Sequence, residues 1–159
     1  APCFKDCTDV RASLRALLAS IQPGDFFALN AFLPFTGEGR REALETIRHG
    51  VAEKRRVVSC LEVGPRYLHS TGQLQKGGTN NGVFLMVSAD ELKDIPLRHV
   101  EPESLGMLAR TQAAADLSIL IERGRRCMHL HLPDNSGVTL RQLAEVISDI
   151  LETMTVPTA

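Results

Sequence analysis

The sequence predicts an α/β fold, a three-layer α/β/α sandwich built around a mainly parallel sheet. Segments with apolar residues at helical spacing alternate with short apolar runs typical of strands. The helical segments are long enough to connect parallel strands as crossovers. Two of the strand runs, residues 56–63 and 82–88, are apolar over most of their length, which is typical of strands covered on both faces.

The predicted elements follow one another along the whole chain. In order they are a helix over residues 10–21, a strand over 26–33, a helix over 37–55, strands over 56–63 and 82–88, a helix over 102–123, a strand over 127–132 and a helix over 139–154. We expect Asp9 to cap the first helix and Pro102 to lie in the first turn of the third. The segments are separated by turn-forming residues, namely Pro23-Gly24, Pro34, Gly64-Pro65 and Gly124.

Each predicted helix carries apolar residues three or four positions apart, which gives it one face for the core. They are Val10, Leu14, Leu17, Leu18 and Ile21 in the first helix, Leu44, Ile47 and Val51 in the second, Leu105, Leu108, Ala113, Leu117 and Ile121 in the third, and Leu140, Leu143, Val146, Ile147 and Leu151 in the last.

Length and charge narrow the class of protein. The 159 residues are predicted to form one domain, with residues 1–23 as a lead-in and first helix. A net charge of −1 and the absence of a basic run argue against nucleic-acid binding. No apolar stretch approaches the roughly 20 residues that span a bilayer. The start has neither an initiator Met nor the apolar core of a signal peptide, so we expect a cytoplasmic protein and a fragment of a longer chain.

The cysteines and paired histidines do not predict a metal site. Cys3 and Cys7 could form half of one, but Cys60 has no cysteine or histidine at ligand spacing. Cys60 and Cys127 lie within apolar runs and are expected to be buried free thiols. His129 and His131 alternate on one face of the last strand, where a structural role at its end or at an interface is the expectation. The sequence therefore predicts no metal and no cofactor.

Residues 64–81 form a long connection between the second and third strands, and long connections in compact domains are often functional. We interpret this stretch as a loop beyond the carboxyl end of a strand, where open α/β sheets bind ligands. Its guanidinium, imidazole, hydroxyl, amide and ammonium groups suit a phosphorylated, polyhydroxylated molecule. Residues 72–79 superficially match a phosphate-binding P-loop, but Lys76 precedes two glycines instead of a serine or threonine.

The segment GPRYLHSTGQLQKGGTNNGVFL, residues 64–85, resembles the carboxy-terminal motif of the phosphoglucose isomerases. The closest likeness is to the form fused behind transaldolase in some bacteria. Tyr67, Gln73 and Lys76 fall on the aromatic, acidic-or-related and lysine positions of the wider isomerase signature. The likeness extends over roughly residues 24–151. Two positions depart from the pattern, because Gln75 replaces the usual His and Thr79 the usual Pro.

The resemblance implies a flavodoxin-like sugar isomerase (SIS) domain that interconverts glucose 6-phosphate and fructose 6-phosphate. It implies that Lys76 is catalytic and assists ring opening, since an ammonium is both a proton donor and a fixed charge beside a developing alkoxide. Gln73 is expected to bind substrate hydroxyls or to orient Lys76. Four more residues are expected to line the substrate pocket, although a capping imidazole or a surface ion pair would explain some equally well: Arg66, His69, Ser70 and Thr71.

The catalytic glutamate, the Ser/Thr cluster that grips phosphate and the histidine donated across the dimer interface have no match in these residues. The resemblance therefore implies a carboxy-terminal part whose partners are the sugar-phosphate substrate, the other SIS domain of the same polypeptide and a second subunit in a homodimer. We expect the isolated chain to be inactive. Two alternatives stay open, a non-catalytic sugar-phosphate-binding SIS module and a domain that mainly supplies a dimer interface.

Overall fold

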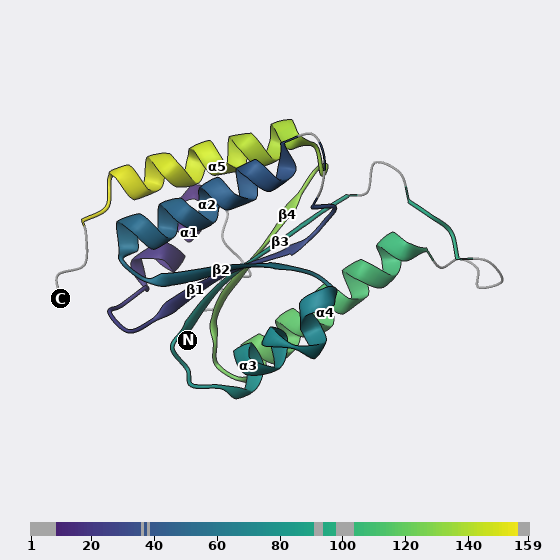
Figure 1. Cartoon of the computed structure of the whole chain (residues 1–159), viewed down its shortest axis with the longest axis horizontal. Helices are drawn as coiled ribbons and strands as arrows, with labels where there is room; N and C mark the ends of the chain where they lie inside the picture. The colour runs from purple at the N-terminus through teal and green to yellow at the C-terminus, as the bar shows by residue number, and fades with distance from the viewer. Residues whose placement is uncertain (1–8, 36, 38, 91–93, 98–103, 156–159) are drawn as a thin grey trace.

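Four parallel strands form one sheet in the order β2-β1-β3-β4, with helices on both faces (Figure 1). The computed structural model describes residues 9–35, 37, 39–90, 94–97 and 104–155. The predicted three-layer α/β/α sandwich is confirmed, and the strand order is that of the first four strands of a flavodoxin-like sheet. The elements are α1 (Val10–Ala19), β1 (Phe26–Phe32), α2 (Arg40–Arg55), β2 (Val58–Val63), the 3-10 helix η1 (Arg66–His69), α3 (Thr71–Gly77), β3 (Gly82–Ala89), α4 (Leu105–Glu122), β4 (Arg126–Leu132) and α5 (Gly137–Glu152).

The two faces of the sheet have different cores. Helices α1, α2 and α5 cover one face, and α3 and α4 lie against the other (Figure 1). Because side chains alternate along a strand, Phe27 and Leu29 of β1 enter the larger core beneath α1, α2 and α5. Ala28 and Phe32 enter the smaller core beneath η1 and α4. The smaller core also receives polar side chains, which are described with the site below.

Helix boundaries differ from the prediction by two or three residues, each for a local reason. Helix α2 begins at Arg40, three residues later than predicted, and ends where Arg56 adopts left-handed backbone angles, with φ of 54°. Strand β2 therefore starts at Val58 and not at residue 56. Helix α5 begins two residues early because the Ser136 hydroxyl accepts a hydrogen bond from the Thr139 amide. Pro102, expected in the first turn of α4, lies outside the described residues, and the Ser104 hydroxyl caps α4 by accepting from the Met107 amide.

Several apolar positions expected in the core are exposed. Val10, Leu105 and Leu108 are among the exposed large hydrophobic residues of α1 and α4, so these predictions were wrong. The other apolar positions predicted for α1, α2 and α5 are buried, apart from the half-buried Val146. Strand β2 lies at the edge of the sheet, where Val58 is 77% exposed, so its apolar sequence does not mark a strand covered on both faces. Within the described parts of the chain, no helix combines the length and apolarity needed to cross a membrane.

Asp9 caps α1 as predicted, since its Oδ1 accepts hydrogen bonds from the amides of Arg11 and Ala12 at 2.9 and 3.2 Å. Replacing Asp9 with Ala leaves these amides without an acceptor, and we expect the free energy of unfolding to fall by about 1 kcal/mol. Urea denaturation measures the change. Asp9→Asn, which keeps a side-chain acceptor, should retain most of the stability. Equal losses in the two variants would contradict the capping role.

Candidate functional site

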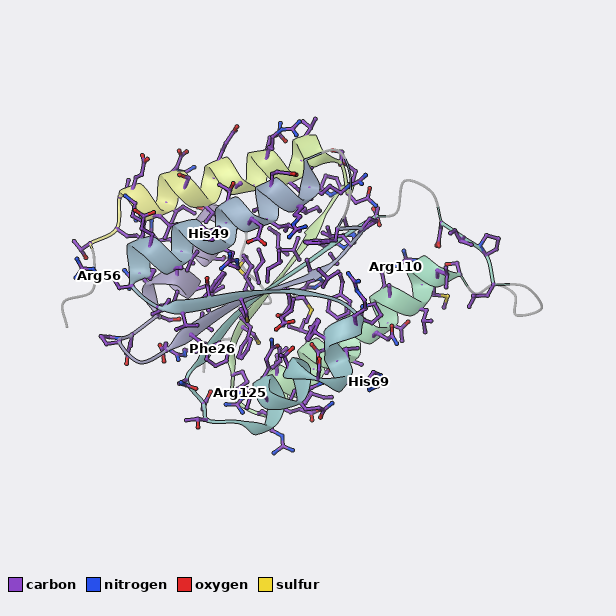
Figure 2. The ribbon with its side chains drawn as sticks, in the orientation of Figure 1. Phe26, His49, Arg56, His69, Arg110 and Arg125 are labelled. Atoms are coloured by element: carbon purple, nitrogen blue, oxygen red, sulfur yellow. The ribbon has the colours of Figure 1, made fainter. Side chains whose placement is uncertain are left out.

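The motif segment is not the loop that the sequence suggests but a pair of short helices, η1 and α3. Arg66 directly follows Pro65 at the carboxyl end of β2, as predicted. The other end of the segment lies at the amino edge of the sheet, because Arg125, just before β4, donates from Nη2 to the carbonyl oxygens of Lys76 and Gly78 at 2.8 and 2.6 Å. Figure 2 shows the labelled His69 and Arg125 at the two ends of this segment. Only the first residues of the motif therefore lie at the carboxyl ends of the strands.

Lys76 lies in a largely buried ion pair with Asp116 of α4. The Lys76 Nζ is 2.8 Å from Asp116 Oδ1, and the two side chains are 13% and 3% exposed. Tyr67 donates its hydroxyl to the other oxygen, Asp116 Oδ2, at 2.6 Å. Burial raises the pKa of Tyr67, and the hydrogen bond to Asp116 and its charge raise it further, so the phenol stays neutral. One buried carboxylate thus joins η1, α3 and α4.

Gln75, the departure from the family pattern, points into the core and not toward solvent. Its Oε1 accepts from Asn30 Nδ2 of β1 at 2.9 Å, and both side chains are buried. Two amides satisfy one another in this position, so burying them costs little. We infer that position 75 is a packing position that couples α3 to the centre of the sheet. The Gln75 side chain is thus held in the core by its amide partner, Asn30.

The remaining predicted substrate-binding residues are exposed on the surface of η1 and α3: Arg66, His69, Ser70, Thr71 and Gln73. Ser70 donates its hydroxyl to the Tyr67 carbonyl at 3.2 Å, and Gln73 Nε2 donates to the Leu68 carbonyl at 2.8 Å. This hydrogen bond links α3 to η1, and its acceptor is the Leu68 carbonyl and not Lys76. His69 lies on the outer side of η1 (Figure 2).

Arg66 lines a cleft with a volume of about 530 Å³ at the carboxyl ends of β1 and β2. Its walls are mostly apolar and include Phe32, Phe35 and Ile95, with Asp94 as the second charged residue. Gly64 forms part of the rim, and a side chain there would meet the Phe32 ring at 2.5 Å. Close packing therefore accounts for the glycine that opens the motif. The six predicted site residues do not share this cleft, which contains Arg66 but not Lys76.

Sequence reasoning missed two residues that complete polar clusters, Asp116 and Ser88. Asp116 lies 40 positions from Lys76 on the buried face of α4, and only the packing of α3 on α4 brings them together. Ser88 ends the apolar run of β3, and its Oγ lies 2.7 Å from His129 Nε2 and 2.9 Å from His131 Nδ1. The in-register pairing of Ser88 with His131 places these groups side by side. Aligning the expected register of β3 with that of β4 could have suggested this contact between Ser88 and His131.

No group of three or more His, Cys, Asp or Glu side chains that could hold a metal occurs among the residues that the structure describes. Cys3 and Cys7 lie outside them. Cys60 and Cys127 are free thiols, as predicted, but Cys60 is only half-buried. Burial, followed by the charge of Glu62, raises the pKa of Cys60 to about 11, so this thiol is a poor nucleophile at neutral pH.

No protein-family model and no curated protein matches the chain. Among solved structures, the chain is similar to the crystal structure of a hypothetical protein, TT0462, from Thermus thermophilus, with a TM-score of 0.74 and 18% sequence identity. The match covers 89% of this chain and 38% of that protein, so the chain spans well under half the length of its neighbour. At this level of identity the likeness shows the fold alone.

Proposed function

We propose that this chain is the carboxy-terminal SIS domain of a glucose-6-phosphate isomerase of the transaldolase-fused type, and that it contributes Lys76 to the interconversion of glucose 6-phosphate and fructose 6-phosphate. The observation that carries the proposal is the convergence of two signature residues, Tyr67 and Lys76, on one buried carboxylate, Asp116. Such a carboxylate fixes the position of an ammonium, which general acid catalysis requires. The resemblance of residues 64–85 to the isomerase motif supplies the reaction.

In this proposal Lys76 donates a proton to the ring oxygen of the closed sugar, and its positive charge stabilises the alkoxide that develops there. Asp116 holds one face of the ammonium, and the remaining protons are available to a substrate oxygen. A glutamate elsewhere in the polypeptide then moves the proton between C2 and C1. The exposed side chains of η1 and α3 form this domain's side of the pocket, and the other SIS domain and a second subunit complete it. No cofactor takes part, and the enzyme works in the cytoplasm.

A non-catalytic sugar-phosphate-binding module is the second candidate, and the Lys76–Asp116 ion pair favours it. A lysine that is mostly buried and ion-paired serves packing as well as chemistry. In a module of this kind the exposed polar groups of η1 and α3 would bind the sugar phosphate without turnover. The two candidates differ in whether Lys76 changes the rate constant for catalysis or only the stability of the domain.

Lys76→Arg in the complete natural polypeptide separates the two candidates. Arginine keeps the positive charge and the ion pair with Asp116, but a guanidinium does not give up its proton in proteins. We expect kcat for fructose 6-phosphate isomerisation to fall about a hundredfold or more. Binding of sorbitol 6-phosphate, which has no carbonyl to isomerise, should be retained.

The matched control is Lys54→Arg on the exposed side of α2, which should leave kcat unchanged. An unchanged kcat in Lys76→Arg would contradict the catalytic role of Lys76. Absence of isomerase activity in the unmodified polypeptide, with sorbitol 6-phosphate binding intact, would support the second candidate. The isolated chain is expected to show no isomerisation, because the proton-transferring base is not among its residues.

A further inference from the structure

A second cavity, with a volume of about 350 Å³, lies between α4 and the strands β3 and β4. One wall is apolar and consists of Ala113, Ala114 and Leu117 of α4. The remaining lining residues are polar and are Ser88, Arg110, Ser118, His129 and His131. A cavity of this size with an apolar wall and convergent polar groups opposite it has the character of a small-molecule site.

Three of the polar groups belong to one hydrogen-bonded chain. His129 Nε2 lies 2.7 Å from Ser88 Oγ, which lies 2.9 Å from His131 Nδ1, and His131 Nε2 lies 3.2 Å from Asp90 Oδ1. An ionised Asp90 can only accept, so His131 Nε2 carries a hydrogen and its Nδ1 accepts from Ser88. Ser88 Oγ then accepts from His129 Nε2. In this arrangement His129 Nδ1 takes no part in the chain and becomes a further donor when the ring is protonated.

The charges around this cavity favour an anion. Arg110 forms no ion pair within 4 Å with any residue in the described part of the chain, and its charge acts at longer range on Asp94. Asp94 is already engaged, since it accepts from Ser104 Oγ and the Gly106 amide. Burial lowers the pKa of His129, and the neighbouring His131 lowers it further, so an empty cavity keeps His129 neutral. An anion between Arg110 and the two rings would reverse that effect.

We propose that this cavity binds a small molecule through a phosphate group held by Arg110 and by Nδ1 of His129, with His131 holding the hydrogen-bonded chain in place through Ser88. A guanidinium fork matches the geometry of two phosphate oxygens, and a protonated His129 adds a charge-assisted hydrogen bond from its Nδ1. The apolar wall of Ala113, Ala114 and Leu117 accommodates the organic part of the ligand. None of residues 66–78 lines the cavity, so the inference goes beyond the proposed isomerase function and does not depend on it.

Binding of inorganic phosphate and of sulfate to the chain, measured by calorimetry and by NMR titration, tests the proposal. We expect saturable binding at one site, weakened about tenfold or more by Arg110→Gln, since a charge-assisted bidentate contact is lost. Arg123→Gln is the matched control. Arg123 is exposed, as Arg110 is, but it lies at the end of α4 and does not line the cavity, so its loss should leave binding unchanged.

Phosphate itself changes charge between about pH 8 and about pH 6, whereas the charge of sulfate stays constant. A pH dependence of sulfate binding therefore reports protonation of the protein. The affinity for sulfate should rise as the pH falls through this range, since the anion-bound form takes up a proton on His129. Arg110, His131 and Asp90 are the charged or titratable groups that face His129 from α4, β4 and the end of β3.

His129→Gln should reduce the pH dependence of sulfate binding, and unfolding midpoints in urea confirm that each variant is folded. The proposal is overturned if neither anion binds saturably. It is also overturned if Arg110→Gln and Arg123→Gln weaken binding equally, which would indicate general charge attraction, or if affinity does not change with pH.

Discussion

Lys76→Met is expected to lower the free energy of unfolding by about 3–5 kcal/mol, because it leaves the carboxylate of Asp116 buried without its cationic partner. Asp116 is 3% exposed and keeps only the hydroxyl of Tyr67, which does not offset the lost charge. Urea denaturation measures the loss, and an unchanged m-value would show that the surface exposed on unfolding is the same in both proteins. The same substitution would abolish activity under the proposed function, so stability must be measured beside it.

Two variants make this prediction specific. Lys76→Met combined with Asp116→Asn removes both charges, and the double variant should be more stable than Lys76→Met alone. Lys54→Met, on the exposed side of α2, should change the free energy of unfolding by less than about 0.5 kcal/mol. A loss in Lys76→Met no larger than that of Lys54→Met would show that the ion pair contributes nothing to stability.

The order and type of the long elements were predictable because each carries its own local signal. Helices α2 and α5 have regular apolar spacing, and Leu44, Ile47 and Leu140 enter the core as expected. The position of helix α4 was predicted correctly, but its buried face was not. This helix is apolar on more than one side, so the sequence does not show which side faces the core. Its buried positions include Asp116, a residue that sequence patterns assign to the surface.

The candidate site was harder to predict than the fold, because its decisive contacts join residues far apart in the sequence. Asn30 meets Gln75, and Lys76 meets Asp116, only once the strand and both helices are packed together. The short helices η1 and α3 have few apolar residues of their own, and tertiary contacts, such as the bonds from Arg125, hold them. A long polar stretch therefore looked like a loop, although its backbone is mostly helical.

Phe27→Ala is expected to lower the free energy of unfolding by about 3–5 kcal/mol, since it removes a fully buried ring from the larger core and leaves a cavity. Phe27 lies in β1, a central strand hydrogen-bonded on both sides, so its surroundings cannot collapse to fill the space. Urea and thermal denaturation both measure the loss.

Phe26→Ala is the matched control, because the same ring is removed one position earlier on the opposite face of the same strand. Phe26 is only partly buried and packs edge-on against Phe84, with ring centroids 5.7 Å apart. Its removal should cost about 1–2 kcal/mol, from the burial that it does have and the lost ring contact. The sequence of β1 does not show which of the two phenylalanines is more deeply buried, whereas the structure places Phe27 in the larger core and Phe26 beside the smaller one. Equal losses would mean that the face beneath α3 and α4 is packed as tightly as the face beneath α1, α2 and α5, contrary to its polar cluster of Asn30, Gln75 and Asp116.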